Sequence, residues 1–447
     1  MKVSFSRGTL IVNDPEERLP DYLTFDERIQ SYSCQAFHYA SLKRSFKNLE
    51  DVVFTESESL NLHHDEKLRS YQKKAIETWA SNDYQGVVVL PTAAGKTHIG
   101  IEAISILSVS TIIIAPTIEL IQQWRTKLEE TFNIKVGQIG GGEKDLQAIT
   151  VCTYDSAYLM AEDLGNKFKF LLVDEVHHLA SERYQEIARM YASHYRLGLT
   201  ATLERVDMLH EQLGDLMGGK VFEQGYEELT EFLSDYEIVR IAVELEQEEE
   251  EEYERNRNIF VSYLRKHRIA LRGPWDFEKF ILSSWNPEGR EALLAWRTAR
   301  EIAFNARIKT DTVRQILMKN RGKKTLIFAE DTVTAYLMSR EFLIPCITYL
   351  TPGPERKKYM EMFREGSITV LATSRVLDEG IDVPDASIGI VLSGSGSTRQ
   401  FRQRLGRLLR PSEGKKSVLY EIVSKGTSEY GTSRRRRKGV PSSTDDN

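Results

Sequence analysis

The sequence of 447 residues is poor in cysteine and has no long apolar run. Its three cysteines, Cys34, Cys152 and Cys346, are isolated, so they form no disulfide framework, zinc site or iron–sulfur ligand set. We expect each to be a small buried residue in a reducing compartment. No stretch of about 18 apolar residues occurs, and the N-terminus lacks the apolar core of a signal peptide. We therefore expect a cytoplasmic protein without a membrane-spanning helix.

An overall basic charge is missing too, since the net charge is −6, which by itself does not favour a nucleic-acid partner. The distribution is more informative. Residues 301–447 carry 26 Lys and Arg against 17 Asp and Glu, whereas residues 1–300 carry 34 against 49. A basic C-terminal third fits a polyanionic partner. Alternatively, the run Arg434–Lys438 and one arginine-rich helix account for most of the excess, although both could themselves contact phosphate.

The full phosphate-binding loop pattern is incomplete, because Leu90 stands where its first glycine would be. Otherwise a short apolar strand leads through a small-residue turn into Gly95-Lys96-Thr97, which opens a helix. In such a loop backbone N–H groups bind phosphate, Lys96 reaches the β- and γ-phosphates, and the Thr97 hydroxyl binds Mg²⁺. Alone, such a match is as often chance as function. The candidate nucleotide-binding residues here are Pro91, Thr92, Ala93, Ala94, Gly95, Lys96 and Thr97.

Five segments differ in their sequence pattern. Residues 1–60 contain short strand patterns and no catalytic constellation, which we interpret as a docking or regulatory module. Strand and helix patterns alternate in 61–225 and again in 301–430, which predicts two parallel α/β domains. Residues 226–300 show helical spacing and are predicted to be a helical insertion or linker. Residues 431–447 form a basic tail that we expect to be disordered.

Two acidic residues, Asp174 and Glu175, follow a buried strand pattern in the first α/β segment. In open α/β sheets the ligand crevice lies at such strand ends. Asp174 can hold Mg²⁺ opposite the loop, and Glu175 can polarise a water for attack on the γ-phosphate. Alone, the pair would more often be a helix N-cap. Its combination with Lys96 in the same predicted sheet favours the catalytic interpretation.

The second α/β segment supplies further candidates. Gln403, Arg407 and Arg410 share one face of a predicted helix, and the two arginines could reach the γ-phosphate across a cleft. Hydrolysis would then depend on domain closure. Taken alone, such a helix is usually a solvated or phosphate-binding face. Gly380 permits an unusual backbone and Asp382 could relay between nucleotide and polymer, although a plain turn is the simpler reading.

The order of these motifs resembles that of superfamily 2 helicases over about residues 65–425. The matching segments are Leu90–Thr97, Ala115–Thr117, Asp174–His177, Thr200–Thr202, Asp378–Asp382 and Gln403–Arg407. The resemblance implies two RecA-like domains that bind ATP and Mg²⁺ between them, with nucleic acid across both. It also implies that Arg69 and Gln72 read the adenine.

Within this superfamily the chain is most similar to the short archaeal form of the XPB family. The segments that carry this similarity are Leu68–Gln72, Thr153–Ala157, Asp174–His178, Val376–Asp385 and Ser393–Ser397. It implies a small α+β damage-recognition-like N-terminal domain and a thumb-like helical insertion. It further implies a 3′→5′ DNA helicase of nucleotide excision repair and transcription, active in an archaeal-type cytosol near the nucleoid. The implied assembly is a monomer, or a heterodimer with a partner nuclease.

Some residues depart from the family pattern. Ala93 replaces a glycine of the loop, and in Arg205–Asp207 a valine replaces the acid of an element linked to strand separation. In the insertion Trp275, Phe277 and Trp285 could stack on a strand, or they could be core. Two other functions stay open, a duplex translocase that remodels DNA without unwinding it and a non-enzymatic scaffold. RNA is a weaker alternative to DNA.

Overall fold

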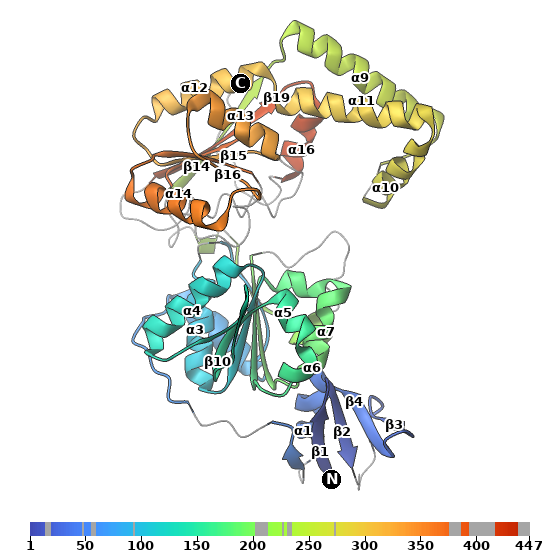
Figure 1. Ribbon diagram of the computed structural model, residues 1–447, viewed down its shortest axis with the longest axis vertical. Coiled ribbons are helices and arrows are strands. Elements are labelled where there is room, and N and C mark those ends of the chain that lie inside the picture. The colour runs from blue at the N-terminus through green and yellow to red at the C-terminus, as the bar shows by residue number, and fades with distance from the viewer. Residues whose placement is uncertain are drawn as a thin grey trace. The chain divides into compact units, whose positions relative to one another are not determined.

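The computed structural model (Figure 1) forms two compact units that divide after Leu229. It describes residues 1–13, 19–46, 49–54, 60–92, 94–201, 213–225, 228–229, 235–271, 274–374, 386–392 and 416–436. Among these residues, no helix is both long and apolar enough to span a membrane.

A five-stranded sheet in the order β3-β4-β2-β1-β5 opens the first unit. Its elements are β1 (Lys2–Ser6), β2 (Thr9–Asn13), β3 (Thr24–Asp26), β4 (Ser31–Gln35), the 3-10 helix η1 (Ala36–His38), α1 (Tyr39–Ser45) and β5 (Glu50–Val52). β1 and β5 are parallel, whereas the other neighbours are antiparallel. Val3, Leu10 and Leu42 are fully buried in its apolar core. The small α+β domain predicted at the N-terminus is therefore confirmed.

The main sheet of the first unit has eight strands in the order β13-β6-β12-β11-β7-β10-β8-β9. They are β6 (Gln85–Val89), β7 (Thr111–Ala115), β8 (Gly137–Gly140), β9 (Glu143–Asp145), β10 (Ile149–Thr153), β11 (Phe170–Asp174), β12 (Tyr195–Thr200) and β13 (Lys220–Glu223). All neighbours are parallel except β8 and β9. Carboxyl ends of parallel strands meet at one edge, so the segments that follow β6, β11 and β12 are neighbours in space.

Helices cover this sheet and account for its apolar strands. They are α2 (Ser70–Ser81), α3 (Lys96–Leu107), α4 (Ile118–Phe132), α5 (Tyr154–Leu159), α6 (Ala161–Leu164), the 3-10 helix η2 (Val176–Ala180), α7 (Glu182–Met190) and α8 (Leu213–Met217). Every residue of β7 and of β11 is buried, as in parallel sheets covered on both faces. The runs of isoleucine, leucine and valine in the sequence are these covered strands.

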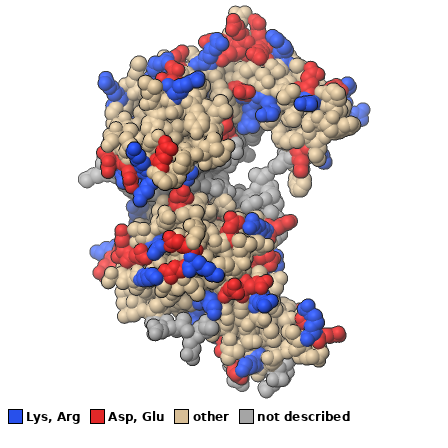
Figure 2. Space-filling view, viewed as in Figure 1, with Lys and Arg blue, Asp and Glu red and all other residues tan. Residues whose placement is uncertain are grey.

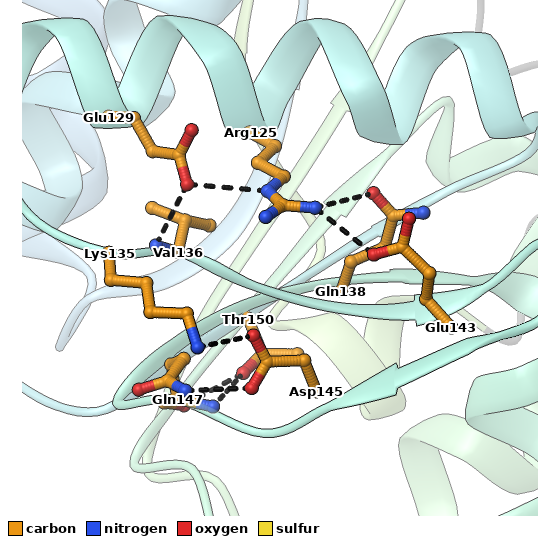
Figure 3. Close-up of polar contacts among 9 residues, drawn as sticks. All are labelled: Arg125, Glu129, Lys135, Val136, Gln138, Glu143, Asp145, Gln147 and Thr150. Carbon is orange, nitrogen blue, oxygen red and sulfur yellow. Dashed lines mark hydrogen bonds and ion pairs between the residues drawn. The ribbon is translucent and has the colours of Figure 1, made fainter.

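A polar network fixes the antiparallel hairpin of β8 and β9 at one edge of the main sheet (Figure 3). From α4, Arg125 Nη1 lies 3.4 Å from Gln138 Oε1 and 3.1 Å from Glu143 Oε2. Lys135 Nζ and Asp145 Oδ2 form a second pair at 2.9 Å. Such partly exposed ion pairs contribute little stability, about 0–1 kcal/mol each. Their charges also mark the edge strand, which discourages pairing with another chain.

The N-terminal sheet packs directly on the rest of the first unit. Ala192, which follows α7, belongs to the apolar core of that small sheet. The two parts approach closely at Gly165, where a Cβ atom would lie 2.3 Å from the Met190 carbonyl oxygen and 2.6 Å from Phe5 Cζ. No side chain fits in that space. Phe37 of η1 in turn packs against the core of the main sheet, so residues 1–60, interpreted from the sequence as a separate module, lie packed on the rest of the unit.

Arg196 of β12 is a buried arginine whose side chain bonds only to main-chain oxygens among the contacts that the structure describes. Its guanidinium donates to the carbonyls of Ser193 (3.1 Å) and Ala188 (2.9 Å). It also donates to those of Leu216 and Tyr191, both at 2.6 Å. Burial lowers the pKa of Arg196 to about 10, so the side chain stays charged at neutral pH. The four bonds tie α7, the turn after it and α8 to β12.

The second unit is built on a six-stranded sheet in the order β14-β19-β18-β15-β17-β16, in which all neighbours are parallel. Its strands are β14 (Asp235–Val243), β15 (Thr325–Phe328), β16 (Cys346–Ile347), β17 (Val370–Thr373), β18 (Ile388–Val391) and β19 (Lys416–Ser424). The helices α12 (Arg307–Lys319), α13 (Thr332–Phe342), α14 (Gly353–Glu365) and α16 (Ser428–Arg436) accompany it. The predicted fold class, with two parallel α/β sheets, is therefore confirmed.

Two segments of the second unit differ from the sequence prediction. β14 pairs with β19 along its whole length, although it falls in 226–300, which the sequence assigns to a helical insertion. Its alternating apolar residues were masked there by the acidic run that follows. α16 continues to Arg436, inside the tail 431–447 expected to be disordered. It is anchored by a buried ion pair of 2.7 Å between Glu429 and Lys309 of α12.

The helical insertion itself consists of α9 (Gln247–Lys266), α10 (Pro274–Leu282), the 3-10 helix η5 (Ser283–Trp285) and α11 (Pro287–Phe304). α9 and α11 lie side by side (Figure 1), and Figure 2 shows acidic side chains gathered at the start of α9. Phe277 is partly buried and packs on Trp296, with 4.8 Å between ring centroids. Trp275 and Trp285 are 76% and 86% exposed. Of the three aromatics named from the sequence, these two are therefore the most accessible to a partner.

The buried charge of Arg196 leads to a prediction for stability. Replacing it in Arg196→Met leaves four buried carbonyls without their donor, so we expect a loss of about 3 kcal/mol, or roughly 6–12 °C in melting temperature. Circular dichroism during heating measures this. Arg183→Met is the matched control, because Arg183 is on α7 with a half-exposed side chain. Equal melting temperatures for the two variants would contradict the role assigned to Arg196.

Candidate functional site

The loop between β6 and α3 presents a helix N-terminus at the carboxyl edge of the main sheet. Gly95, the N-cap of α3, has a left-handed backbone with φ of 73°. Lys96 is the first residue of α3, and its Nζ lies 3.2 Å from the Leu90 carbonyl oxygen and 3.5 Å from that of Pro91. The first N–H groups of a helix have no partner within it and attract an anion. Ala93 lies outside the described residues.

The first turn of α2 holds this loop in place. Gln72 Nε2 donates to the carbonyl oxygens of Ala94 (3.2 Å) and Gly95 (3.3 Å), and its Oε1 accepts from the Arg69 N–H at 2.8 Å. The Tyr71 hydroxyl donates to the Ala94 carbonyl at 2.8 Å. A Cβ atom on Gly95 would lie 2.5 Å from Gln72 Nε2, and the φ of 73° also favours glycine at this position. The Gln72 amide is thus engaged with the loop, and adenine reading by Arg69 and Gln72 stays a prediction.

Asp174 closes β11 as a buried carboxylate with both oxygens bonded. Trp124 Nε1 of α4 donates to Oδ2, and the Glu175 N–H donates to Oδ1, each at 2.9 Å. Burial, together with the neighbouring Glu175 carboxylate, raises the pKa of Asp174 to about 6, against the opposing influence of Trp124 and Lys96. A carboxylate fixed in this way can bind a cation, and the positive charge of the cation would favour the ionised form of Asp174.

Glu175 leaves the strand in a left-handed conformation, with φ of 49° and ψ of 51°. This conformation is uncommon for a residue with a side chain and marks functional sites. The Glu175 carboxylate oxygen Oε2 accepts a hydrogen bond of 3.3 Å from the Thr200 hydroxyl. His177 Nδ1 lies 2.9 Å from that hydroxyl and 3.4 Å from Glu175 Oε2. Side chains therefore join the segment after β11 to the last residue of β12.

A buried tyrosine contacts the turn at Asp174 and Glu175. Tyr154 begins α5, is 2% exposed, and its hydroxyl lies 2.9 Å from the Asp174 carbonyl oxygen and 3.1 Å from that of Glu175. Sequence reasoning assigned a role neither to Tyr154 nor to Trp124. Tyr154 was included only in a family-like segment, and Trp124 follows the ordinary apolar spacing of an amphipathic helix. The contacts of Trp124 and Tyr154 with the Asp174 turn join residues far apart in the sequence, so no local sequence pattern predicts them.

The structure thus brings one half of the predicted site together. Strand β6 neighbours β12, and β12 neighbours β11, so the Lys96 loop, Thr200 and the Asp174–Glu175 pair follow adjacent strands. Pro91, Thr92 and Thr97 belong to the same loop and the first turn of α3, whereas several further predicted residues lie outside the described part of the chain. These are Ala93, Gly380, Asp382, Gln403, Arg407 and Arg410, together with Thr202 and Arg205–Asp207.

Three protein-family models match the chain. The damage recognition domain of the xeroderma pigmentosum group B helicase matches residues 3–52. The res subunit of type III restriction enzymes matches 65–205, and the helicase conserved C-terminal domain matches 308–412. The helicase domain of Pyrococcus furiosus Hef is similar in fold, with a TM-score of 0.53 at 16% identity over 82% of this chain and 97% of that one.

Among curated proteins, the chain is 43% identical to the DNA 3′-5′ translocase XPB2 of Sulfurisphaera tokodaii, over 93% of this chain and 96% of the relative. It is 31% identical to a putative DNA 3′-5′ helicase Rad25 of Haloarcula marismortui, over 84% of this chain and 55% of the relative. It is 27% identical to the DNA 3′-5′ helicase XPB of Mycobacterium tuberculosis, over 87% and 67%. The resemblance noted in the sequence is confirmed: the chain belongs to the XPB family of superfamily 2 DNA helicases and translocases.

Proposed function

We propose that the chain couples ATP hydrolysis to 3′→5′ movement along DNA and thereby opens duplex DNA in nucleotide excision repair. The observation that carries this proposal is the Glu175–Thr200 hydrogen bond beside the Lys96 loop. This bond supports a site in which the Glu175 carboxylate is oriented to polarise the attacking water. The names of the relatives, a DNA 3′-5′ translocase and DNA 3′-5′ helicases, support the polarity and the substrate.

The residues of the first unit divide the work on ATP. Lys96 binds the β- and γ-phosphates at the start of α3, and Glu175 polarises the attacking water. Thr97 and Asp174 hold Mg²⁺. They fit this ion because a hydroxyl and a carboxylate are hard oxygen donors, and Mg²⁺ is usually bound by one or two protein groups with phosphate oxygens and waters. When bound, the ion neutralises charge that develops on the phosphates.

The second unit completes the site in this proposal. Gln403, Arg407 and Arg410 approach the γ-phosphate on domain closure, while Gly380 and Asp382 link nucleotide and DNA. The match of residues 308–412 to the helicase C-terminal domain supports the assignment, because all five residues fall within it. Hydrolysis then requires both units, as expected when charge on the transferring phosphoryl group is stabilised from a second domain.

A second candidate is a translocase that remodels duplex DNA without separating its strands. It is favoured by the valine at position 206, because the corresponding family element has an acid there. A non-enzymatic scaffold is disfavoured by the intact charged groups of the first unit. The resemblance to the XPB family also supports a cytosolic location near the nucleoid. It further supports an assembly that is either a monomer or a heterodimer with a partner nuclease.

The role of Glu175 gives a direct test. Glu175→Gln keeps the side-chain shape but removes the base, so we expect ATP binding to persist while DNA-stimulated turnover falls at least ~10²-fold. Binding is measured with a fluorescent ATP analogue and turnover by phosphate release. Glu182→Gln is the control, because Glu182 is exposed at the start of α7. Near-normal turnover in Glu175→Gln would remove Glu175 from this role.

Triplex displacement and forked-duplex separation distinguish the two motors on one preparation. We expect ATP-dependent triplex displacement to exceed strand separation, since position 206 lacks the acid. Val206→Glu should raise strand separation several-fold and leave ATP turnover and triplex displacement unchanged, with Val206→Gln as the uncharged control. Equal separation by all three proteins would exclude position 206 as the determinant, and no stimulation of ATP turnover by any DNA would undo the proposed function.

A further inference from the structure

The backbone at Glu175 needs support from outside its own strand. A left-handed φ places a side-chain-bearing residue in a region of poor steric energy, and such conformations persist only where the surroundings impose them. The Glu175 side chain is held by Thr200 and His177, but these bonds fix the carboxylate rather than the main chain. The main chain has contacts of its own, since the Glu175 N–H donates to Asp174 Oδ1 at 2.9 Å and the His178 N–H donates to the Glu175 carbonyl at 3.0 Å. A buried side chain adds a further contact to this turn.

The Tyr154 hydroxyl is this further contact. It lies within hydrogen-bond distance of two successive carbonyl oxygens, those of Asp174 and Glu175. In an extended strand, successive carbonyls point to opposite sides, so one hydroxyl can reach both only where the chain has left the strand geometry. The hydroxyl therefore selects the turned conformation at Glu175 over a continued strand.

The surroundings of Tyr154 allow little freedom. Its side chain is buried in the main core, and its ring lies 5.1 Å from that of Tyr184 and 5.7 Å from that of His178 between centroids. Its backbone is fixed at the start of α5, where the Thr153 side chain accepts from the Ser156 N–H. The Tyr154 side chain is thus a rigid link between the end of β10 and the turn after β11.

We propose that Tyr154 is a positioning residue for ATP hydrolysis, and that its hydroxyl holds the left-handed turn which aims the Glu175 carboxylate at the attacking water. The inference rests on the proposed role of Glu175. It also assigns a physical reason to the tyrosine at the end of β10, which has no place among the groups that bind ATP. Because the Tyr154 hydroxyl affects only the orientation of Glu175, its loss slows ATP hydrolysis without weakening ATP binding.

Tyr154→Phe is the test, because it keeps the ring and removes only the hydroxyl. We expect kcat to fall roughly tenfold or more, since a misplacement of about 1 Å can cost up to about 10²-fold, while KM and the affinity for a fluorescent ATP analogue stay unchanged. Tyr191→Phe is the matched control. Tyr191 is a fully buried tyrosine of the same core whose hydroxyl donates to a single carbonyl, that of Ala157, at 3.3 Å. Its kcat should match the unmodified protein.

A double variant shows whether Tyr154 acts through Glu175. In the Glu175→Gln background, Tyr154→Phe should have no further effect on single-turnover hydrolysis, whereas an independent role would reduce it again. Melting curves and analogue binding check the fold of each variant first. Unfolding, weaker ATP binding or an unchanged kcat in Tyr154→Phe would overturn the proposal. Absence of ATP turnover in the unmodified protein would contradict the proposed function itself.

Discussion

The parallel alignment of β6, β12 and β11 is the constraint on which the candidate site depends. Because the three strands run in one direction side by side, their carboxyl ends bring a phosphate-binding loop, a threonine and two acids to one edge. Nearly all residues of these three strands are buried. Their burial under helices on both faces keeps the edge in place, so the precision of the site comes from the core.

Each unit also contains a buried charge that joins elements distant in sequence. Arg196 bonds to main-chain oxygens of the first unit, whereas Lys309 and Glu429 form an ion pair in the second. Lys309 Nζ further donates to the Leu392 carbonyl at 2.9 Å, so it also ties α12 to the end of β18. Such groups add directional bonds to an apolar core, in which burial alone would not fix the orientation of a helix.

Much of this arrangement could be predicted from the sequence, because alternating apolar runs and polar strand ends are local patterns. The fold class and the positions of Lys96, Asp174 and Glu175 after their strands are of this kind. The supports of the site, Trp124 and Tyr154, could not be predicted. They look like ordinary core aromatics, and their partners are distant along the chain. β14 was missed for a different reason, the acidic run that directly follows its apolar residues in the sequence.

The contact between the N-terminal sheet and the rest of the first unit, at Ala192 and Phe37, has a thermodynamic consequence. Apolar surface buried at this contact is exposed when either part unfolds, so the contact couples the unfolding of the two. A ligand that binds either sheet raises the free energy of unfolding of both by mass action. α7 lies at this contact: it begins at Glu182, after the 3-10 helix η2 that follows Glu175, and its last residue, Met190, lies beside Gly165 and Gly8. A ligand bound to the N-terminal sheet would therefore also stabilise α7, the helix that follows Asp174 and Glu175 in the chain.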